Sequence, residues 1–308
     1  MIHEKVTVVI PCYNVSDCIS EAVHQLLNGP ALVPVVLIDN GSTDNTYEVL
    51  LQLKENFSHV VIDQESKKGA CAARNRGLTH VQTEFVKFLD ADDLITQEML
   101  QSQWNEASLA QCDILFAPYE KRKVNGDSSI ISPNHEVWKG LFTTRLGLTS
   151  ALLFKTKAVI QAGGWNEEIQ SSQEYDLIFR LLQRKSSFSF STVVGAVVRE
   201  RASGQISTSN PIPRWTNYLA LRKRILSFLE ESETVYFLKE KHFFLQAYFD
   251  VLHIVFPYLP DESNREYNRV IKGRFTPVPS AACSSLFVKL VRVFGFKNAE
   301  KIKSLLSK

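Results

Sequence analysis

Residues 35–54 read VVLIDNGSTDNTYEVLLQLK and contain one complete unit of the expected fold. The apolar run Val35–Ile38 predicts a buried strand, and the polar residues after it predict a loop at the carboxyl end of that strand. A helix is expected to begin after Ser42 or Thr43, because residues then recur at helical spacing. The residues at this spacing are Tyr47, Leu50, Leu51 and Lys54. The stretch therefore predicts a strand, a loop and a helix in succession.

The same unit recurs on both sides of this stretch. Further strands are predicted at Val6–Ile10, Val60–Ile62, Phe85–Leu89 and Ile114–Ala117. One helix is expected to be capped by Ser16 and to end at Gly29, a second spans Gly69–His80, and a third is capped by Thr96. The apolar face of the first consists of Ile19, Ala22, Val23, Leu26 and Leu27. Strands separated by helices of this length predict an α/β fold with a doubly wound, mostly parallel sheet.

The pattern changes twice after residue 118. Asn125-Gly126 predicts a β-hairpin, and further strands are expected at Ser150–Phe154 and Val193–Val198, with a helix at Glu174–Arg184. From residue 211 the sequence is rich in Phe, Tyr and Leu at helical spacing. We therefore expect an α/β domain over residues 1–210 and a helical C-terminal region over residues 211–308.

The composition is that of an ordinary globular protein, with 44% hydrophobic and 22% charged residues. A formal net charge of +2 gives no overall attraction to nucleic acid, so no nucleic-acid partner is expected. The five cysteines are odd in number and lack zinc-ligand spacing, which favours a reducing compartment. No signal-peptide pattern and no apolar run of roughly 18 residues is found. A cytoplasmic protein is expected, either free or peripheral at the inner face of the membrane.

Polar residues follow the first four predicted strands at their carboxyl ends. The segments are Pro11-Cys12-Tyr13-Asn14, Asp39-Asn40-Gly41-Ser42-Thr43-Asp44, Gly69 with Arg74-Asn75, and Asp90-Ala91-Asp92-Asp93. Ligands of open α/β sheets bind at the carboxyl ends of the strands. We therefore expect the four segments to line one crevice.

The segment after the fourth strand is the most acidic of the four. Asp90, Asp92 and Asp93 are three carboxylates within four residues, and they repel one another unless a cation lies between them. Oxygen ligands suit Mg²⁺ or Mn²⁺, and such an ion stabilises the charge that develops on a leaving diphosphate. A polar loop before a helix gives the same pattern, so the segment alone leaves both interpretations open.

Six short motifs occur together along the chain: Pro11-x-Tyr13-Asn14, Asp39-x-Gly41-Ser42-Thr43-Asp44, Ala73-Arg74-Asn75 with Gly77, Asp90-x-Asp92, Ala162-Gly163-Gly164-Trp165-Asn166-Glu167 and Gln173-Glu174-Tyr175-Asp176-Leu177. Their order resembles that of glycosyltransferase family 2. Each motif alone is weak, whereas six in order are specific. The resemblance covers residues 5–207. It implies a GT-A catalytic domain that transfers a sugar from a nucleotide-sugar, a UDP-sugar by default, to a saccharide or lipid-linked acceptor.

The resemblance also implies roles for individual residues. The nucleotide-sugar would be bound by Pro11, Tyr13, Asn14, Asp39, Asn40, Arg74, Asp90, Ala91 and Asp92. Tyr13 and Asp39 correspond to positions that hold the nucleobase, and Asp92 with Asp90 to positions that hold Mn²⁺ or Mg²⁺. Glu174 corresponds to the catalytic base, which would take the proton from the acceptor hydroxyl in an inverting single displacement.

Three positions depart from the family pattern. Asn40 stands where many members have a second Asp, and Lys67 stands where many have an Asn two residues before the glycine. Arg201 stands where many carry a His, and an Arg side chain can contact phosphate but cannot bind a cation. These departures leave the donor preference and the metal affinity open.

The residues by themselves also allow other functions. A sugar nucleotidyltransferase shares the sheet and the metal carboxylates, but the segment 11–14 lacks the glycine and the basic residue of its phosphate loop. A nucleotide- or carbohydrate-binding module without activity is the other alternative, although the presence of Asp90, Asp92 and Glu174 together opposes it. Trp165 is expected either to pack in the core or to stack on a sugar.

The C-terminal segment is amphipathic and basic. Apolar residues recur at helical spacing at Leu286, Phe287, Leu290, Val291 and Phe294. Residues 280–308 contain six Lys or Arg residues and one acidic residue. Such a helix can lie on an anionic membrane surface or pack its apolar stripe on the Phe-rich run Phe243–Phe256. The sequence leaves these two possibilities open.

Overall fold

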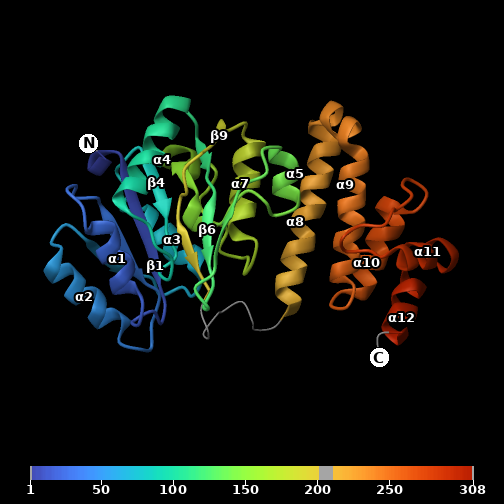
Figure 1. The fold of residues 1–308 in the computed structure, drawn as a ribbon, viewed down its shortest axis with the longest axis horizontal. Helices are drawn as coiled ribbons and strands as arrows, with labels where there is room; N and C mark the ends of the chain where they lie inside the picture. Colours follow the sequence, from blue (N-terminus) through green and yellow to red (C-terminus); the bar gives the residue numbers. More distant parts are fainter. Residues whose placement is uncertain (1, 201–210, 307–308) are drawn as a thin grey trace. The chain divides into compact units, whose positions relative to one another are not determined.

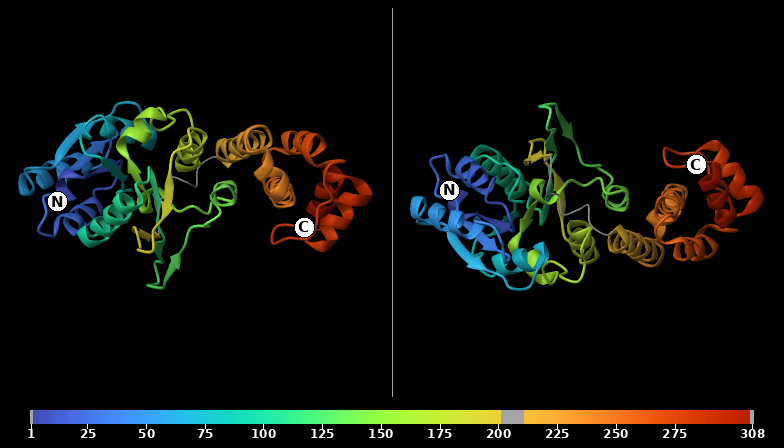
Figure 2. Two further views of the ribbon diagram at one scale, coloured as in Figure 1. Left: turned by 90° about the horizontal axis from the view of Figure 1, so that it is seen from above. Right: turned by 90° about the horizontal axis from the view of Figure 1, so that it is seen from below.

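The computed structural model describes residues 2–200 and 211–306 (Figure 1). The described residues divide into two compact units, one made of residues 2–169 and 173–200 and the other of residues 170–172 and 211–306. The first unit is built around a sheet, and the second consists of helices (Figure 2).

The main sheet of the first unit has seven strands in the order β3-β2-β1-β4-β8-β5-β9. The strands are β1 (Val6–Cys12), β2 (Val35–Asp39), β3 (Val61–Gln64), β4 (Phe85–Phe88), β5 (Ile114–Phe116), β8 (Leu153–Lys155) and β9 (Phe188–Phe190). Neighbouring strands are parallel except at β8, which runs antiparallel to β4 and β5. The predicted α/β fold with a mostly parallel sheet is confirmed. The sequence pattern missed the short strand β9.

Helices cover both faces of this sheet, as a doubly wound fold requires. The helices of the unit are α1 (Ile19–Leu27), α2 (Thr46–Asn56), α3 (Ala70–Leu78), α4 (Gln97–Ala110), α5 (Val137–Phe142), α6 (Thr156–Gln161) and α7 (Gln173–Gln183). Val8 of β1 shares a core cluster with Val23 of α1 and Leu100 of α4. Val9 points to the opposite face and meets Gly77 of α3. A Cβ at position 77 would lie 2.3 Å from Val9 Cγ1, so glycine allows α3 to lie close to the sheet.

Two details of the predicted helices are wrong. Ser16 does not cap α1, which follows Cys18 without a side-chain cap. Ser16 lies two residues before that position, and its hydroxyl donates to Asp44 at 2.7 Å. Leu51 of α2 is 43% exposed and does not belong to its buried face. The cap predicted at Thr96 is confirmed, since its hydroxyl accepts from Met99 N at 3.2 Å.

A second sheet of three strands has the order β10-β6-β7. Its strands are β6 (Tyr119–Arg122), β7 (Ser128–Ile131) and β10 (Val197–Arg199). β6 and β7 are antiparallel and Gly126 has a φ of 89°, which confirms the predicted hairpin. The strand predicted at 193–198 shortens to β10. The strand predicted at 150–154 begins only at Leu153, because residues 149–151 form a 3-10 turn.

The second unit is a set of helices with an aromatic core. They are α8 (Pro211–Ser232), α9 (Thr234–Val255), α10 (Pro260–Glu266), a π-helical turn at Tyr267–Ile271, α11 (Ser285–Phe294) and α12 (Phe296–Leu306). The ring of Phe249 lies 6.2 Å from that of Phe287 and 5.9 Å from that of Phe296. α9 therefore supplies the packing partner expected for α11. Within the described ranges, no helix combines the length and the apolar character that crossing a membrane requires.

Candidate functional site

Asn14 joins the loops that follow β1 and β2. Its Oδ1 accepts from Thr43 N at 2.8 Å and its Nδ2 donates to Thr43 Oγ1 at 3.2 Å. Its own backbone N–H donates to Ser42 Oγ at 3.1 Å. The φ of Asn14 is 51°, in the left-handed region that asparagine tolerates better than most residues. The side chain of Asn14 is thus largely used in holding the two loops together.

Asp39 and Tyr13 lie at neighbouring strand ends. Cys12 and Asp39 are register partners between β1 and β2, and Tyr13 is the residue that follows Cys12 at the end of β1. The Asp39 side chain is buried and accepts from Ser42 N at 3.3 Å. The Tyr13 residue is 38% exposed. A buried carboxylate and an exposed aromatic ring at neighbouring strand ends can bind a planar base by a hydrogen bond and by stacking.

Asn40 is buried and holds the loop between β3 and α3. Its Nδ2 donates to the carbonyl oxygens of Glu65 and Lys67 at 2.9 and 2.8 Å. Its Oδ1 accepts from Gly69 N at 2.8 Å. An aspartate could not make the two donations, because an ionised carboxylate only accepts hydrogen bonds. Asn40, which was expected to touch the nucleotide-sugar, thus uses its amide within the protein.

Arg74 of α3 connects the end of β4 with the start of α7. Its NH2 donates to Asp90 Oδ1 at 2.6 Å and its NH1 to Gln173 Oε1 at 3.0 Å. The guanidinium lies 4.5 Å from the centre of the Trp165 ring, a distance at which the ring face attracts a cation. The Arg74 side chain is 6% exposed and that of Asp90 is 38% exposed. The buried guanidinium of Arg74 therefore joins Asp90 and Gln173, which belong to motifs far apart in the sequence.

Trp165 packs in the core. It is 2% exposed, and its ring meets Phe88 edge-on at 5.0 Å. Asn75 accepts from Trp165 N at 2.8 Å and donates to Trp165 O at 2.9 Å, so the loop is bound to α3. Of the two alternatives for this residue, packing is what the structure supports.

The acidic loop after β4 combines exposed and buried carboxyl groups. Asp90 and Asp92 are partly exposed, whereas Ala91 and Asp93 are buried. Burial and the neighbouring charges of Asp90 and Asp92 raise the pKa of Asp93 to about 8. The backbone N–H of Asp90 donates to Ser150 Oγ at 3.0 Å, a contact across 60 residues of sequence. The loop thus concentrates negative charge that a cation would relieve.

Arg199 of β10 holds the acidic loop in place, a role that was not predicted from the sequence. Its Nε donates to Asp92 O at 2.6 Å and its backbone N–H to Asp93 Oδ1 at 3.3 Å. Its NH1 also pairs with Glu21 of α1. A basic residue at the end of a strand was the only sequence signal for this role. Arg201, which was compared with the family's histidine, lies outside the described residues.

Glu174 lies in the first turn of α7, next to Gln173, which accepts from Arg74. It is partly exposed. Burial raises the pKa of the Cys71 thiol in α3 to about 11. The charge of Arg74 acts to lower this pKa and that of Glu174 acts to raise it, so both charged side chains lie near Cys71. Asp176 is buried two residues later and pairs with Arg180 at 2.8 Å. A partly exposed carboxylate at the position of Glu174 can serve as a base, whereas Asp176 is buried beside Arg180.

The carboxylates of the acidic loop suit a weakly enclosed cation. In the part of the chain that the structure describes, no group of three or more His, Cys, Asp or Glu side chains could hold a metal ion. Mg²⁺ is commonly held by one or two carboxylates together with substrate phosphates. Asp92 and Asp90 fit this kind of site, since both offer oxygen atoms and neither is fully buried.

The chain is similar to known glycosyltransferases in sequence and in fold. The family model described as Glycosyl transferase family 2 matches residues 7–160, which is half of the chain. Glycosyltransferase GlyG of Streptococcus pneumoniae is 29% identical over 118 residues, 38% of this chain and 39% of that protein. The uncharacterized glycosyltransferase YibD of Escherichia coli is 30% identical over 149 residues, 48% of this chain and 41% of that protein. The matches thus span about two fifths of the length of these relatives.

The fold comparison extends over nearly the whole chain. S. aureus TarS residues 1–349, solved in complex with UDP-GlcNAc, superpose with a TM-score of 0.62 at 17% identity, covering 98% of this chain and 92% of that one. At this identity the likeness concerns the fold alone. The family model, however, begins in β1 and runs through the acidic loop, so it includes the strand ends described above. The chain therefore belongs to glycosyltransferase family 2.

Proposed function

We propose that this protein transfers a sugar from a nucleotide-sugar to a hydroxyl group of a saccharide or lipid-linked acceptor, with the aid of a divalent cation. In this proposal the first unit is the catalytic domain. Family membership supports the class of reaction, and the strand-end residues support the individual roles.

The observation that carries the proposal is the hydrogen-bonded connection from Asp90 through Arg74 to Gln173. It connects the acidic loop, where a diphosphate and its cation would bind, to the first turn of α7, where Glu174 lies. A displacement at an anomeric carbon needs a base on one side and a leaving group on the other, held in a fixed relation. A buried arginine between the two elements provides such a relation.

The donor is proposed to be a UDP-sugar. Tyr13 and Asp39 would hold the base, the former through its exposed ring and the latter through its buried carboxylate. TarS, which shares the fold, has been solved with UDP-GlcNAc, and this supports a uridine nucleotide here. Asn14 and Asn40 would act indirectly, by fixing the loops that surround the base.

Asp92 and Asp90 would hold the cation, with Asp92 as the direct ligand. When bound, Mn²⁺ or Mg²⁺ would neutralise charge on the leaving diphosphate. Arg74 would orient Asp90, since its guanidinium donates to one of the two carboxylate oxygens. Arg199 would keep Asp92 in position by holding the backbone carbonyl of that residue.

Glu174 is proposed as the catalytic base. It would take the proton of the acceptor hydroxyl while that oxygen attacks the anomeric carbon and the bond to the diphosphate breaks. One base on the face opposite the leaving group gives a single displacement, and the anomeric configuration is then inverted. Both Gln173 and Glu174 lie at the start of α7, so the base is held by the helix that Arg74 fixes.

The proposal is tested by measuring nucleotide release from a panel of UDP-, GDP-, CMP- and dTDP-sugars, with and without saccharide acceptors. Release that depends on an acceptor and is lost in EDTA is expected. A sugar nucleotidyltransferase would instead consume a nucleoside triphosphate and a sugar phosphate. Binding without release from any donor would support a module without activity and would contradict the proposal.

A further inference from the structure

α11 is apolar on two faces, and packing uses only one of them. Phe287, Val288 and Val291 are buried in the second unit. Leu286, Val293 and Phe294 are exposed to 57%, 72% and 51%. A helix that only packs on a protein core normally carries polar residues on its other side. The exposed apolar residues of α11 therefore require a separate explanation.

The apolar stripe predicted for residues 286–294 divides into a buried part and an exposed part. Phe287 packs against α9, with its ring 4.2 Å from that of His253, so the packing alternative is correct for this part of the stripe. Leu286 and Phe294 belong to the same predicted stripe but lie outside the core. Packing and surface exposure thus occur together on one short helix.

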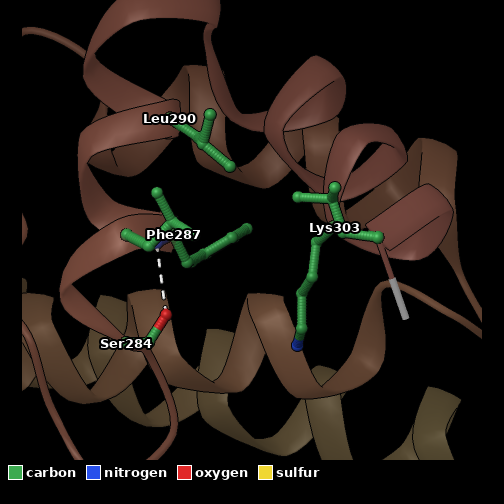
Figure 3. Close-up of a pocket in the computed structure, with 6 residues that line it drawn as sticks. Ser284, Phe287, Leu290 and Lys303 are labelled. Atoms are coloured by element: carbon green, nitrogen blue, oxygen red, sulfur yellow. Dashed lines mark hydrogen bonds between the residues drawn. The ribbon is translucent and has the colours of Figure 1, made fainter.

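The exposed apolar surface continues from α11 to α12. An open pocket of about 230 Å³ lies between the two helices, lined by Ser284, Leu286, Phe287, Leu290, Lys303 and Leu306 (Figure 3). In Figure 3, Phe287 and Leu290 project from one helix and Lys303 from the other. Leu305 and Leu306 of α12 are exposed to 74% and 70%. The exposed side chains of these two neighbouring helices are here called the α11–α12 face.

The charge of this face is basic because its acidic residue is buried. The segment 280–306 contains one acidic residue, Glu300, and this residue is buried. Its Oε1 atom lies 2.6 Å from His253 Nδ1. The Nζ atom of Lys303 lies 2.7 Å from His253 Nε2. An ammonium group only donates, so Nε2 accepts and Nδ1 carries the proton given to Glu300. Lys289, Lys301 and Lys303 remain at the surface.

We propose that the α11–α12 face docks on an anionic lipid bilayer. Its apolar part consists of Leu286, Leu290, Val293, Phe294, Leu305 and Leu306, and its basic part of Lys289, Lys301 and Lys303. Apolar side chains enter the boundary between headgroups and acyl chains, while lysines attract anionic headgroups. The combination of exposed apolar residues with a wholly basic set of exposed charges matches such a bilayer better than it matches a neutral protein surface. This docking is independent of sugar transfer and would bring the chain to lipid-linked acceptors.

The test measures cosedimentation of the full chain with vesicles, without any donor sugar. Vesicles of phosphatidylcholine alone are compared with vesicles that contain phosphatidylglycerol. The wild-type chain is expected to bind the anionic vesicles, and more weakly as salt rises, because salt screens surface charges. Lys289→Gln with Lys301→Gln is expected to weaken this binding roughly 10- to 30-fold, given the attraction of each basic residue near such a surface.

A second variant tests the apolar part of the face. Val293→Ser, Phe294→Ser and Leu305→Ser together change residues that are more than half exposed, so the fold is expected to persist and is checked by circular dichroism. Binding of this triple variant to anionic vesicles is expected to be lost. The matched control changes Val235, Leu238 and Lys239 of α9 to Ser, Ser and Gln, since these are also exposed residues of the second unit.

Several outcomes would overturn the proposal. They are absence of vesicle binding by the wild-type chain at low salt, equal binding by the triple variant, and an equal loss in the α9 control. A dimer that dissociates in the triple variant, with no vesicle binding, would assign the face to a second copy of the chain. Because donor and acceptor are absent from the assay, failure here is distinct from failure of the proposed transferase activity.

Discussion

The strand-end loops of the first unit and the helices of the second unit use their side chains differently. In the first unit, Asn14, Asn40 and Asn75 each bond through their amides to the backbone of another loop. In the second unit, rings such as Phe249 and Phe296 pack on one another. The backbone of a loop at a strand end lacks a ladder partner, so side chains must supply its hydrogen bonds. Helices satisfy their own backbone, and their side chains are available for packing.

This contrast predicts that substitutions in the two units have different consequences. At the strand ends of the first unit, changes are expected to alter activity or local loop structure. In the second unit, changes in the core are expected to alter stability alone. Each of the following experiments can support or contradict this distinction.

The largest effect is expected for Glu174→Gln. Glutamine keeps the size of the side chain but does not take up a proton, so turnover is expected to fall on the order of 10²- to 10⁴-fold while donor affinity and stability stay unchanged. Initial rates and donor binding are measured side by side. Glu168→Gln is the matched control, because Glu168 lies six residues earlier with its side chain 83% exposed. A loss of donor binding without a loss of turnover would make Glu174 a structural residue.

The counterpart in the second unit is Phe249→Ala. Phe249 is fully buried among aromatic rings, and truncating a core phenylalanine costs about 3–5 kcal/mol of stability. Denaturant unfolding measures this loss. Transferase activity well below the unfolding transition is expected to stay unchanged. Leu238→Ala, at a residue 62% exposed, serves as the control. If activity falls in parallel with stability, the two units are not separate in function.

Asp92→Asn is expected to slow sugar transfer, because the proposed cation would lose its direct ligand. The activation free energy is expected to rise by about several kcal/mol. The fold is expected to persist, since Asp92 is partly exposed. The measurements are transfer rates over a range of Mn²⁺ concentrations and the unfolding transition. Asp127→Asn, in the exposed turn between β6 and β7, is the control. Full activity of Asp92→Asn, or of the wild-type protein in EDTA, would contradict the role of the metal.

The buried Lys87 is expected to make the free energy of unfolding depend on pH. It is fully buried in β4, its Nζ donates to Gln103 Oε1 at 2.6 Å, and burial lowers its pKa to about 7. Between about pH 7 and 10.4 the unfolded chain holds a proton at this lysine that the folded chain lacks, so its contribution makes stability rise with pH by a few kcal/mol.

The measurement compares the free energy of unfolding of the wild-type protein and Lys87→Met at pH 7 and pH 9.5. Buried thiols such as Cys12, whose pKa is raised by burial, act in the opposite direction but cancel in the difference between the two proteins. Lys54→Met, at an exposed position of α2, is expected to show no such difference. A difference that does not change with pH would mean that Lys87 is charged in the folded state.

The smallest effect is expected for Asn40→Asp, the residue that many family members carry. The carbonyl oxygens of Glu65 and Lys67 would lose their donor, and stability is expected to fall by about 1–3 kcal/mol. Hydrogen exchange at residues 65–69 and unfolding measure this change, with Asn45→Asp as the exposed control. Unchanged stability together with an altered donor preference would instead give Asn40 a direct role in donor binding.

The local elements and the order of the motifs could be predicted from the amino-acid sequence alone. The alternation of apolar runs with amphipathic runs predicted β1 to β5, α1 to α4 and α7, and Asn125-Gly126 predicted the hairpin. These features depend on residues within one or two turns or strands, so their period can be found in the chain without knowledge of its partners. The apolar face of α1 was predicted residue by residue for the same reason.

Contacts between residues distant in the sequence could not be predicted in this way. β8 lies antiparallel between β4 and β5, Arg199 donates to the carbonyl oxygen of Asp92, and Asp90 donates to Ser150. Each of these contacts joins positions tens of residues apart in the sequence. The same holds for Asn40, whose amide holds a loop, and for α11, whose apolar stripe divides into a buried and an exposed part. A pattern along the chain specifies which side chains share a face, but the neighbour against which that face lies is set by long-range packing and by the need to pair buried polar groups.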